Sequence, residues 1–112
     1  MSRADQDLVR WRVTLNRELT VVHFELLPDE PLSPDVLGSI GLPSDVVGRE
    51  HLGLVISGRG PVWLYARLVH EAHPFAWVAT YDPRLAGAVV VHRHRADAPA
   101  VGQVVDLSPG QR

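Results

Sequence analysis

The sequence predicts a single α/β domain, residues 1–112, with a mixed sheet, a central β-α-β crossover, an N-terminal hairpin and few helices. Its 112 residues suffice for one hydrophobic core and are too few for two domains. Short apolar runs recur along the chain, several with the period-two alternation of half-buried strands. One helical pattern lies between two of these runs, and this order predicts a right-handed parallel crossover.

The N-terminal quarter predicts a β-hairpin. Apolar and polar residues alternate over Val9 to Leu15, and again over Thr20 to Leu27 after a turn at 16–18. A proline-rich loop follows, in which Ser33 and Pro34 are typical of an N-cap and a first helical position. We therefore expect a short helix from Asp35 to Ile40, and an irregular segment after it.

The central and C-terminal parts predict the crossover and two returning strands. Leu52 to Ser57 is an apolar run typical of a buried strand, and Pro61 to Ala72 has the spacing of a helix with one apolar face. Further strands are expected at Phe75 to Tyr81, Ala88 to His92 and Gln103 to Leu107. The turn Leu-Ala-Gly before the fifth strand can shift that strand's register by one residue. Residues 108–112 are expected to form a flexible tail.

Composition excludes several classes of function. The absence of cysteine excludes disulfide scaffolds, thiolate metal sites and a cysteine nucleophile. No apolar run reaches the roughly 20 residues of a membrane span, and the N-terminus is too polar for a signal peptide, so we expect a cytoplasmic protein. The net charge of -2 argues against coating of duplex DNA. All eleven basic residues are arginine, which suits local contacts with phosphates.

Polar residues follow the two strands that the crossover makes parallel. Ser57-Gly58-Arg59-Gly60 comes after the first of them and Asp82-Pro83-Arg84 after the second. Ligands of open α/β sheets bind at such carboxyl ends, where glycines expose backbone N–H groups and a helix N-terminus favours anions. The pattern predicts a phosphate or nucleotide half-site. The alternative is that both segments form only tight turns.

Four histidines are predicted at the opposite end of the sheet. The helix is roughly 18 Å long at 1.5 Å per residue, so His70 and His73 lie far from the glycines. The returning strand brings His92 and His94 to the same end, on one face. Several imidazoles predict metal binding or proton transfer, although His70 alone could simply cap the helix. If both ends serve one reaction, its site must be composite and formed by stacked subunits.

The motifs SGRGP at 57–61, His70-Glu71-Ala72-His73-Pro74, YDPRL at 81–85 and the valines at 89–91 resemble a known family. The chain resembles the small CRISPR-associated ring nucleases of type III systems over nearly its whole length. The resemblance implies a Rossmann-like domain that forms homodimers. It also implies that a dimer of dimers stacks around cyclic tetra-adenylate or short adenylate RNA, which is cleaved with Mn²⁺. Neither a membrane nor duplex DNA is an expected partner.

The resemblance also assigns roles by position. Ligand binding falls to Ser57, Gly58, Arg59, Gly60 and Arg84, metal binding to His70, His73, Asp82 and His94, and catalysis to His73, Asp82 and Arg84. The strand histidine is ambiguous, because His92 precedes His94 by two residues. The implied function is removal of a cyclic oligoadenylate messenger, which switches off antiviral signalling. A non-catalytic sensor of the same ligand and a 3′ deadenylase of linear RNA are the alternatives.

Overall fold

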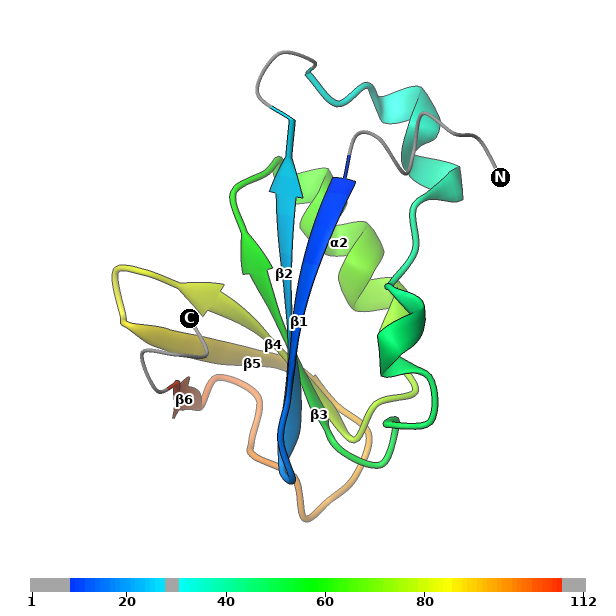
Figure 1. The fold of residues 1–112 in the computed structure, drawn as a ribbon. Helices are drawn as coiled ribbons and strands as arrows, with labels where there is room; N and C mark the ends of the chain where they lie inside the picture. Colours follow the sequence, from blue (N-terminus) through cyan, green and yellow to red (C-terminus); the bar gives the residue numbers. More distant parts are fainter. Residues whose placement is uncertain (1–8, 28–30, 108–112) are drawn as a thin grey trace.

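The computed structural model describes residues 9–27 and 31–107, which form one six-stranded mixed sheet with few helices (Figure 1). The elements are β1 (Val9–Leu15), β2 (Leu19–Leu26), η1 (Pro34–Ser39), η2 (Ser44–Val46), β3 (Gly53–Gly58), α2 (Val62–Glu71), β4 (Trp77–Asp82), β5 (Gly87–Arg93) and β6 (Val104–Asp106). Every predicted strand is present, and the long helix occupies the predicted segment. The predicted tail at 108–112 lies outside the described residues.

The strands lie side by side in chain order, and their directions define two edges of the sheet. β1 and β2 form the predicted antiparallel hairpin, and β3 and β4 are parallel as the crossover requires. β2 is also parallel to β3, so the sheet has three parallel strands where the sequence predicted two. We call the edge where β2, β3 and β4 end the carboxyl edge, and the opposite one the amino edge.

The helices cover one face of the sheet, which we call the helix face (Figure 1). A core cluster there joins Phe24, Leu54 and Ile56 of the strands to Leu64 and Leu68 of α2. A second, smaller cluster lies on the other face, which no helix of residues 9–27 or 31–107 covers. We call this the helix-free face. Apolar side chains alternate between the two clusters, because successive residues of a strand point to opposite faces.

The short helix predicted at Asp35 to Ile40 is a 3₁₀ helix, η1. Ser33 stands at its N-cap and Pro34 opens it, as expected, but the serine side chain makes no capping hydrogen bond. A second 3₁₀ helix, η2, occupies part of the segment that was expected to be irregular. No helix in the described part of the chain is long and apolar enough to cross a membrane.

A β-bulge in the β4–β5 pair decides which way the strand histidines face. Asp82 pairs with Gly87 and Ala79 with Val90, but Val78 pairs with His92, so Val91 is left without a partner. The expected shift in register therefore lies at the far end of β5 and not at the turn after Arg84. Because Val78 belongs to the core under α2, the bulge places His92 on the helix face.

Candidate functional site

The segment 57–61, which we call the glycine loop, passes close to β2 at the carboxyl edge. Gly58 has φ +141°, and a β-carbon there would lie 2.4 Å from the carbonyl oxygen of Phe24. A β-carbon at Gly60 would lie 2.7 Å from the Phe24 ring. Both glycines are thus required by contact with Phe24, and the turn that they form brings the loop backbone against the sheet.

Tyr65 of α2 holds the loop from the helix side. Its hydroxyl donates a hydrogen bond of 2.6 Å to the carbonyl oxygen of Gly58. Burial raises the pKa of Tyr65, so the phenol stays protonated and can donate at neutral pH. The helix begins after Pro61 with no side-chain cap, and its first N–H groups lack intrahelical acceptors. In the sequence, only helical periodicity over Pro61 to Ala72 marks Tyr65.

Ser57 is directed to the helix-free face. Its side chain is buried, with the residue 3% exposed, and its Oγ lies 3.1 Å from Nδ1 of His23 on β2. The role predicted for Ser57 was ligand binding, whereas within one chain its hydroxyl contacts this histidine. His23 lies within the predicted strand Thr20 to Leu27, and nothing in the alternation of that strand indicates a function for it. Burial, and next the charge of Arg12, lower its pKa.

Asp82 and Arg84 form a forked ion pair at the end of β4. The Arg84 side chain donates to both carboxylate oxygens, at 3.2 Å from Nε and 3.0 Å from Nη2. Its backbone N–H donates to Oδ1 at 2.9 Å. These hydrogen bonds hold the pKa of the Asp82 carboxyl below its ordinary value. The Arg84 side chain is 88% exposed, so a tethered guanidinium faces solvent beside the loop.

An open cavity of about 350 Å³ lies between the glycine loop, α2 and the end of β4. Its lining residues are Gly58, Tyr65, Thr80, Tyr81, Asp82, Pro83 and Val89. The structure thus brings together two of the predicted site residues, Gly58 and Asp82, from the two strand ends. Thr80, which lines the same cavity, carried no signal beyond strand periodicity, and Tyr81 was noted only as the first residue of the YDPRL motif.

The helix histidines lie at the amino edge, as the helix length predicted. The rings of His70 and His73 have centroids 5.9 Å apart. Nδ1 of His73 lies 3.0 Å from the carbonyl oxygen of His70. Because a carbonyl oxygen can only accept, Nδ1 carries the proton and Nε2 of His73 has its lone pair free when the ring is neutral.

The strand histidines form a separate pair. The ring centroids of His92 and His94 are 6.5 Å apart. Nε2 of His92 is buried without a hydrogen-bond partner, whereas His94 is exposed. Of the two, His94 is therefore accessible to a second molecule.

The four histidines lie at the same end of the sheet, as predicted, but they do not form one metal-binding group. Among residues 9–27 and 31–107, no group of three or more histidine or acidic side chains could hold a metal ion. The helix and strand histidines sit on two different elements, and their rings contact each other only within each pair. A complete metal site would therefore need ligands from another chain.

The donor set nevertheless fits a divalent cation that two chains share. His73 offers a free Nε2, and imidazole is a common ligand of transition metals. A carboxylate has about four acceptor sites, and Arg84 occupies three of those on Asp82, so one remains on Oδ2.

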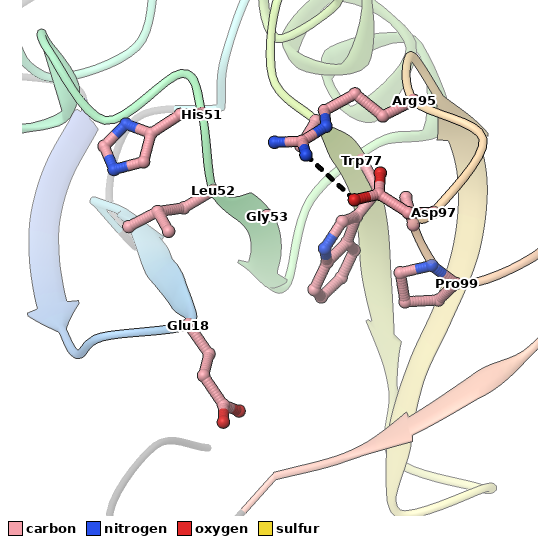
Figure 2. A pocket seen from close by; sticks show the side chains of 10 residues that line it. Glu18, His51, Leu52, Gly53, Trp77, Arg95, Asp97 and Pro99 are labelled. Carbon is pink, nitrogen blue, oxygen red and sulfur yellow. Dashed lines mark hydrogen bonds and ion pairs between the residues drawn. The ribbon is translucent and has the colours of Figure 1, made fainter.

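A second cavity, of about 180 Å³, opens at the amino edge on the helix-free face (Figure 2). Figure 2 shows His51 and Leu52 on one side of it, and Trp77 with the Arg95–Asp97 ion pair on the other. The Trp77 ring lies against Gly53, where a β-carbon would come within 2.0 Å of it. None of the predicted site residues lines this cavity.

Comparisons with known proteins support the resemblance found in the sequence. A family model described as CRISPR-associated protein (Cas_csx3) matches residues 25–106, a segment that contains every predicted site residue. A curated protein of Aquifex aeolicus (strain VF5), described as an uncharacterized protein, is 40% identical over 105 residues. The alignment covers 92% of each chain.

Proposed function

The chain belongs to the CRISPR-associated Cas_csx3 family, and from this premise we propose that it is a ring nuclease that cleaves cyclic tetra-adenylate. Membership of the family gives the protein a CRISPR-related role. Cleavage of the cyclic messenger would switch off the antiviral response that the messenger drives. We also propose that the fold of the chain is Rossmann-like.

The observation that carries the proposal is the anion-binding surface of the carboxyl edge. Tyr65 and Phe24 hold the glycine loop, and the uncapped N-terminus of α2 directs N–H groups toward the same region. Arg84, tethered by Asp82, supplies a positive charge beside the cavity. A phosphodiester backbone is the kind of ligand that such donors bind.

Cleavage of a phosphodiester needs a group that moves one proton. A water or a ribose 2′-hydroxyl forms the new P–O bond and loses a proton, while the leaving oxygen gains one as the old bond breaks. His73 suits this task, because its hydrogen bond to His70 leaves Nε2 free to accept or donate. Asp82 holds Arg84 against a phosphate oxygen.

The two edges act together only when subunits stack. His73 and the glycine loop lie at opposite ends of α2, which has 10 residues and is about 15 Å long. We therefore propose that dimers stack with the ligand between the carboxyl edge of one and the amino edge of the next. His70 and His73 of one subunit and Asp82 of another would hold Mn²⁺, which would supply positive charge next to the phosphate. The predicted ligand His94 forms no three-ligand group with this pair among the described residues of one chain.

The test is incubation of the purified protein with cyclic tetra-adenylate, with and without Mn²⁺, and chromatography of the products. The proposal predicts linear products that depend on the metal. Linear tetra-adenylate and an RNA with a 3′ adenylate tail, incubated in parallel, distinguish a ring nuclease from a deadenylase. Faster cleavage of the linear substrates would overturn the proposal in favour of the deadenylase.

The second candidate is a binding module that senses the same ligand. The absence of a three-ligand group in the described residues of one chain favours it, because the histidines would then be structural. Tight binding without cleavage at any metal concentration would identify the sensor. Loss of cleavage but retention of binding in His73→Ala would identify the enzyme.

A further inference from the structure

Strand β2 contacts the glycine loop from both faces of the sheet. The register pairs His23 with Ser57 and Phe24 with Gly58. Phe24 fills the space beside Gly58 and Gly60 on the helix face. His23, one residue earlier, lies within hydrogen-bond distance of Ser57 on the helix-free face. Two consecutive residues of β2 thus fix the start of the loop.

The contact between His23 and Ser57 is buried on the serine side, whereas His23 is partly exposed. Nδ1 and Oγ are 3.1 Å apart, and Ser57 is only 3% exposed. A buried hydroxyl that loses its partner has little access to water, so its desolvation is left uncompensated. The orientation of Ser57, and therefore of the backbone that leads into Gly58, depends on whether Nδ1 of His23 accepts or donates a hydrogen bond.

Charged and titratable groups at four other positions share the helix-free face with His23. Arg12 is its cross-strand partner on β1, with Arg10 on the same face of that strand, and Glu25 follows on β2. Tyr81 lies on this face of β4. Burial and Arg12 lower the pKa of His23 from 6.5, and Glu25 opposes them with a smaller effect. At neutral pH the imidazole is uncharged.

An uncharged imidazole and a charged one offer different partners to the serine. The uncharged ring has one nitrogen that accepts and one that donates, whereas both nitrogens of the charged ring donate. A neutral Nδ1 can accept the proton of the Ser57 hydroxyl, and a protonated Nδ1 cannot. In the tautomer that carries its proton on Nε2, Nδ1 accepts from Ser57, and protonation of His23 then forces the hydroxyl of Ser57 to reorient.

We propose that His23 is a positioning residue of the candidate site, which accepts a hydrogen bond from Ser57 and so holds the glycine loop ready for phosphate. His23 does so only in its uncharged form. The identity of the ligand rests on the proposed function. The coupling between His23 and the loop does not, and it can be measured without any ligand.

The ligand-free experiment is an NMR titration from pH 5 to pH 8. We expect the amide signals of Gly58 and Gly60 to shift with the titration of the His23 ring. In His23→Asn this component disappears, because the asparagine amide can still hydrogen-bond to Ser57 but does not titrate. His51→Asn, which removes an imidazole at the amino edge, leaves it unchanged. Loop signals that ignore His23 would overturn the proposal.

The binding experiment measures Kd for cyclic tetra-adenylate at pH 7.5. We expect His23→Ala to weaken binding about tenfold, the effect of one hydrogen bond, and His23→Asn to bind like the wild type. In a Ser57→Ala background, His23→Ala should weaken binding no further, since it acts through that hydroxyl. Additive losses would overturn the proposal. A wild type that binds no cyclic tetra-adenylate rejects the proposed function alone, and the titration then decides the role of His23.

Discussion

The polar side chains at the two edges of the sheet differ in how far contacts within the chain fix them. At the carboxyl edge, Tyr65 bonds Gly58, and Arg84 is bonded to Asp82 by three N–H groups. At the amino edge, the histidines are largely exposed and form two separate pairs. The comparison indicates that one chain orders the side chains of its carboxyl edge by contacts within itself, whereas the histidines of its amino edge contact one another in pairs and mostly face solvent.

The largest expected effect comes from the amino edge. His73→Ala should lower the rate of cyclic tetra-adenylate cleavage by about 100- to 10,000-fold, the usual contribution of a proton-transfer group. The free energy of unfolding of this variant should stay within about 0.5 kcal/mol of the wild-type value, because the His73 side chain is exposed. His51→Ala is the matched control at the same edge, and it should cleave normally. Equal losses in both variants would mean that His73 has no specific role.

The second effect tests the preorganised edge. Gly58→Ala should destabilise the fold by about 3 kcal/mol and abolish ligand binding, because the new methyl group meets the Phe24 carbonyl and φ is positive. Gly102→Ala is the control, since Gly102 has φ +94° and no atom within 4 Å of the added carbon. It should lose only about 1 kcal/mol. Chemical denaturation measures both values, and a Gly58 loss no greater than the control would contradict the close contact.

The third effect concerns the tether of Arg84. Arg84→Ala should weaken ligand binding about tenfold, through loss of a charged hydrogen-bond donor. It should also raise the pKa of Asp82 toward its ordinary value of 3.8, because the bonds from Arg84 are what lower it. Carbon-13 NMR of the carboxyl group measures this shift. An Asp82 pKa that does not move would mean that the pair does not form in solution.

The ion pair of Asp82 and Arg84 also determines how the stability of the folded protein changes with pH. A carboxyl group with a lowered pKa stabilises the folded protein fully above 3.8, and this stabilisation is lost as the pH falls through the lower, folded value. Asp82 is therefore ionised throughout pH 5 to pH 8, and any change in activity in that interval must come from other groups. In a pH profile of cleavage, Asp82→Asn should leave unchanged the pH at which activity falls on the acidic side.

The smallest effect is expected at the amino-edge cavity. Arg95 and Asp97 are both more than half exposed, and exposed ion pairs contribute little. Arg95→Ala should change the free energy of unfolding by less than about 0.5 kcal/mol, as measured by thermal denaturation. A larger loss would show that the cavity wall is part of the fold's stability, and that the amino edge is more ordered than its exposed histidines suggest.

Sequence patterns predicted most of the fold and the edge of the sheet at which each predicted site residue lies, but not the contacts that these residues make. Alternation and proline placement were enough for the hairpin, the crossover and the separation of His73 from the glycine loop. They could not distinguish His23 and Tyr65 from other strand and helix residues, because their roles depend on partners 34 and 7 positions away. The register shift was predicted at the turn after Arg84 but lies at Val91, because strand pairing and not local propensity decides its position.

The sequence by itself determined which segments are strands and helices, and which polar residues end up at each edge, because hydrophobic periodicity and chain direction are local properties. It also carried the family resemblance. Only the tertiary structure decided that Ser57 contacts His23, that Arg84 is tethered to Asp82, and that the histidines remain two pairs. These outcomes depend on strand register and side-chain packing between distant segments, which no single stretch of sequence encodes.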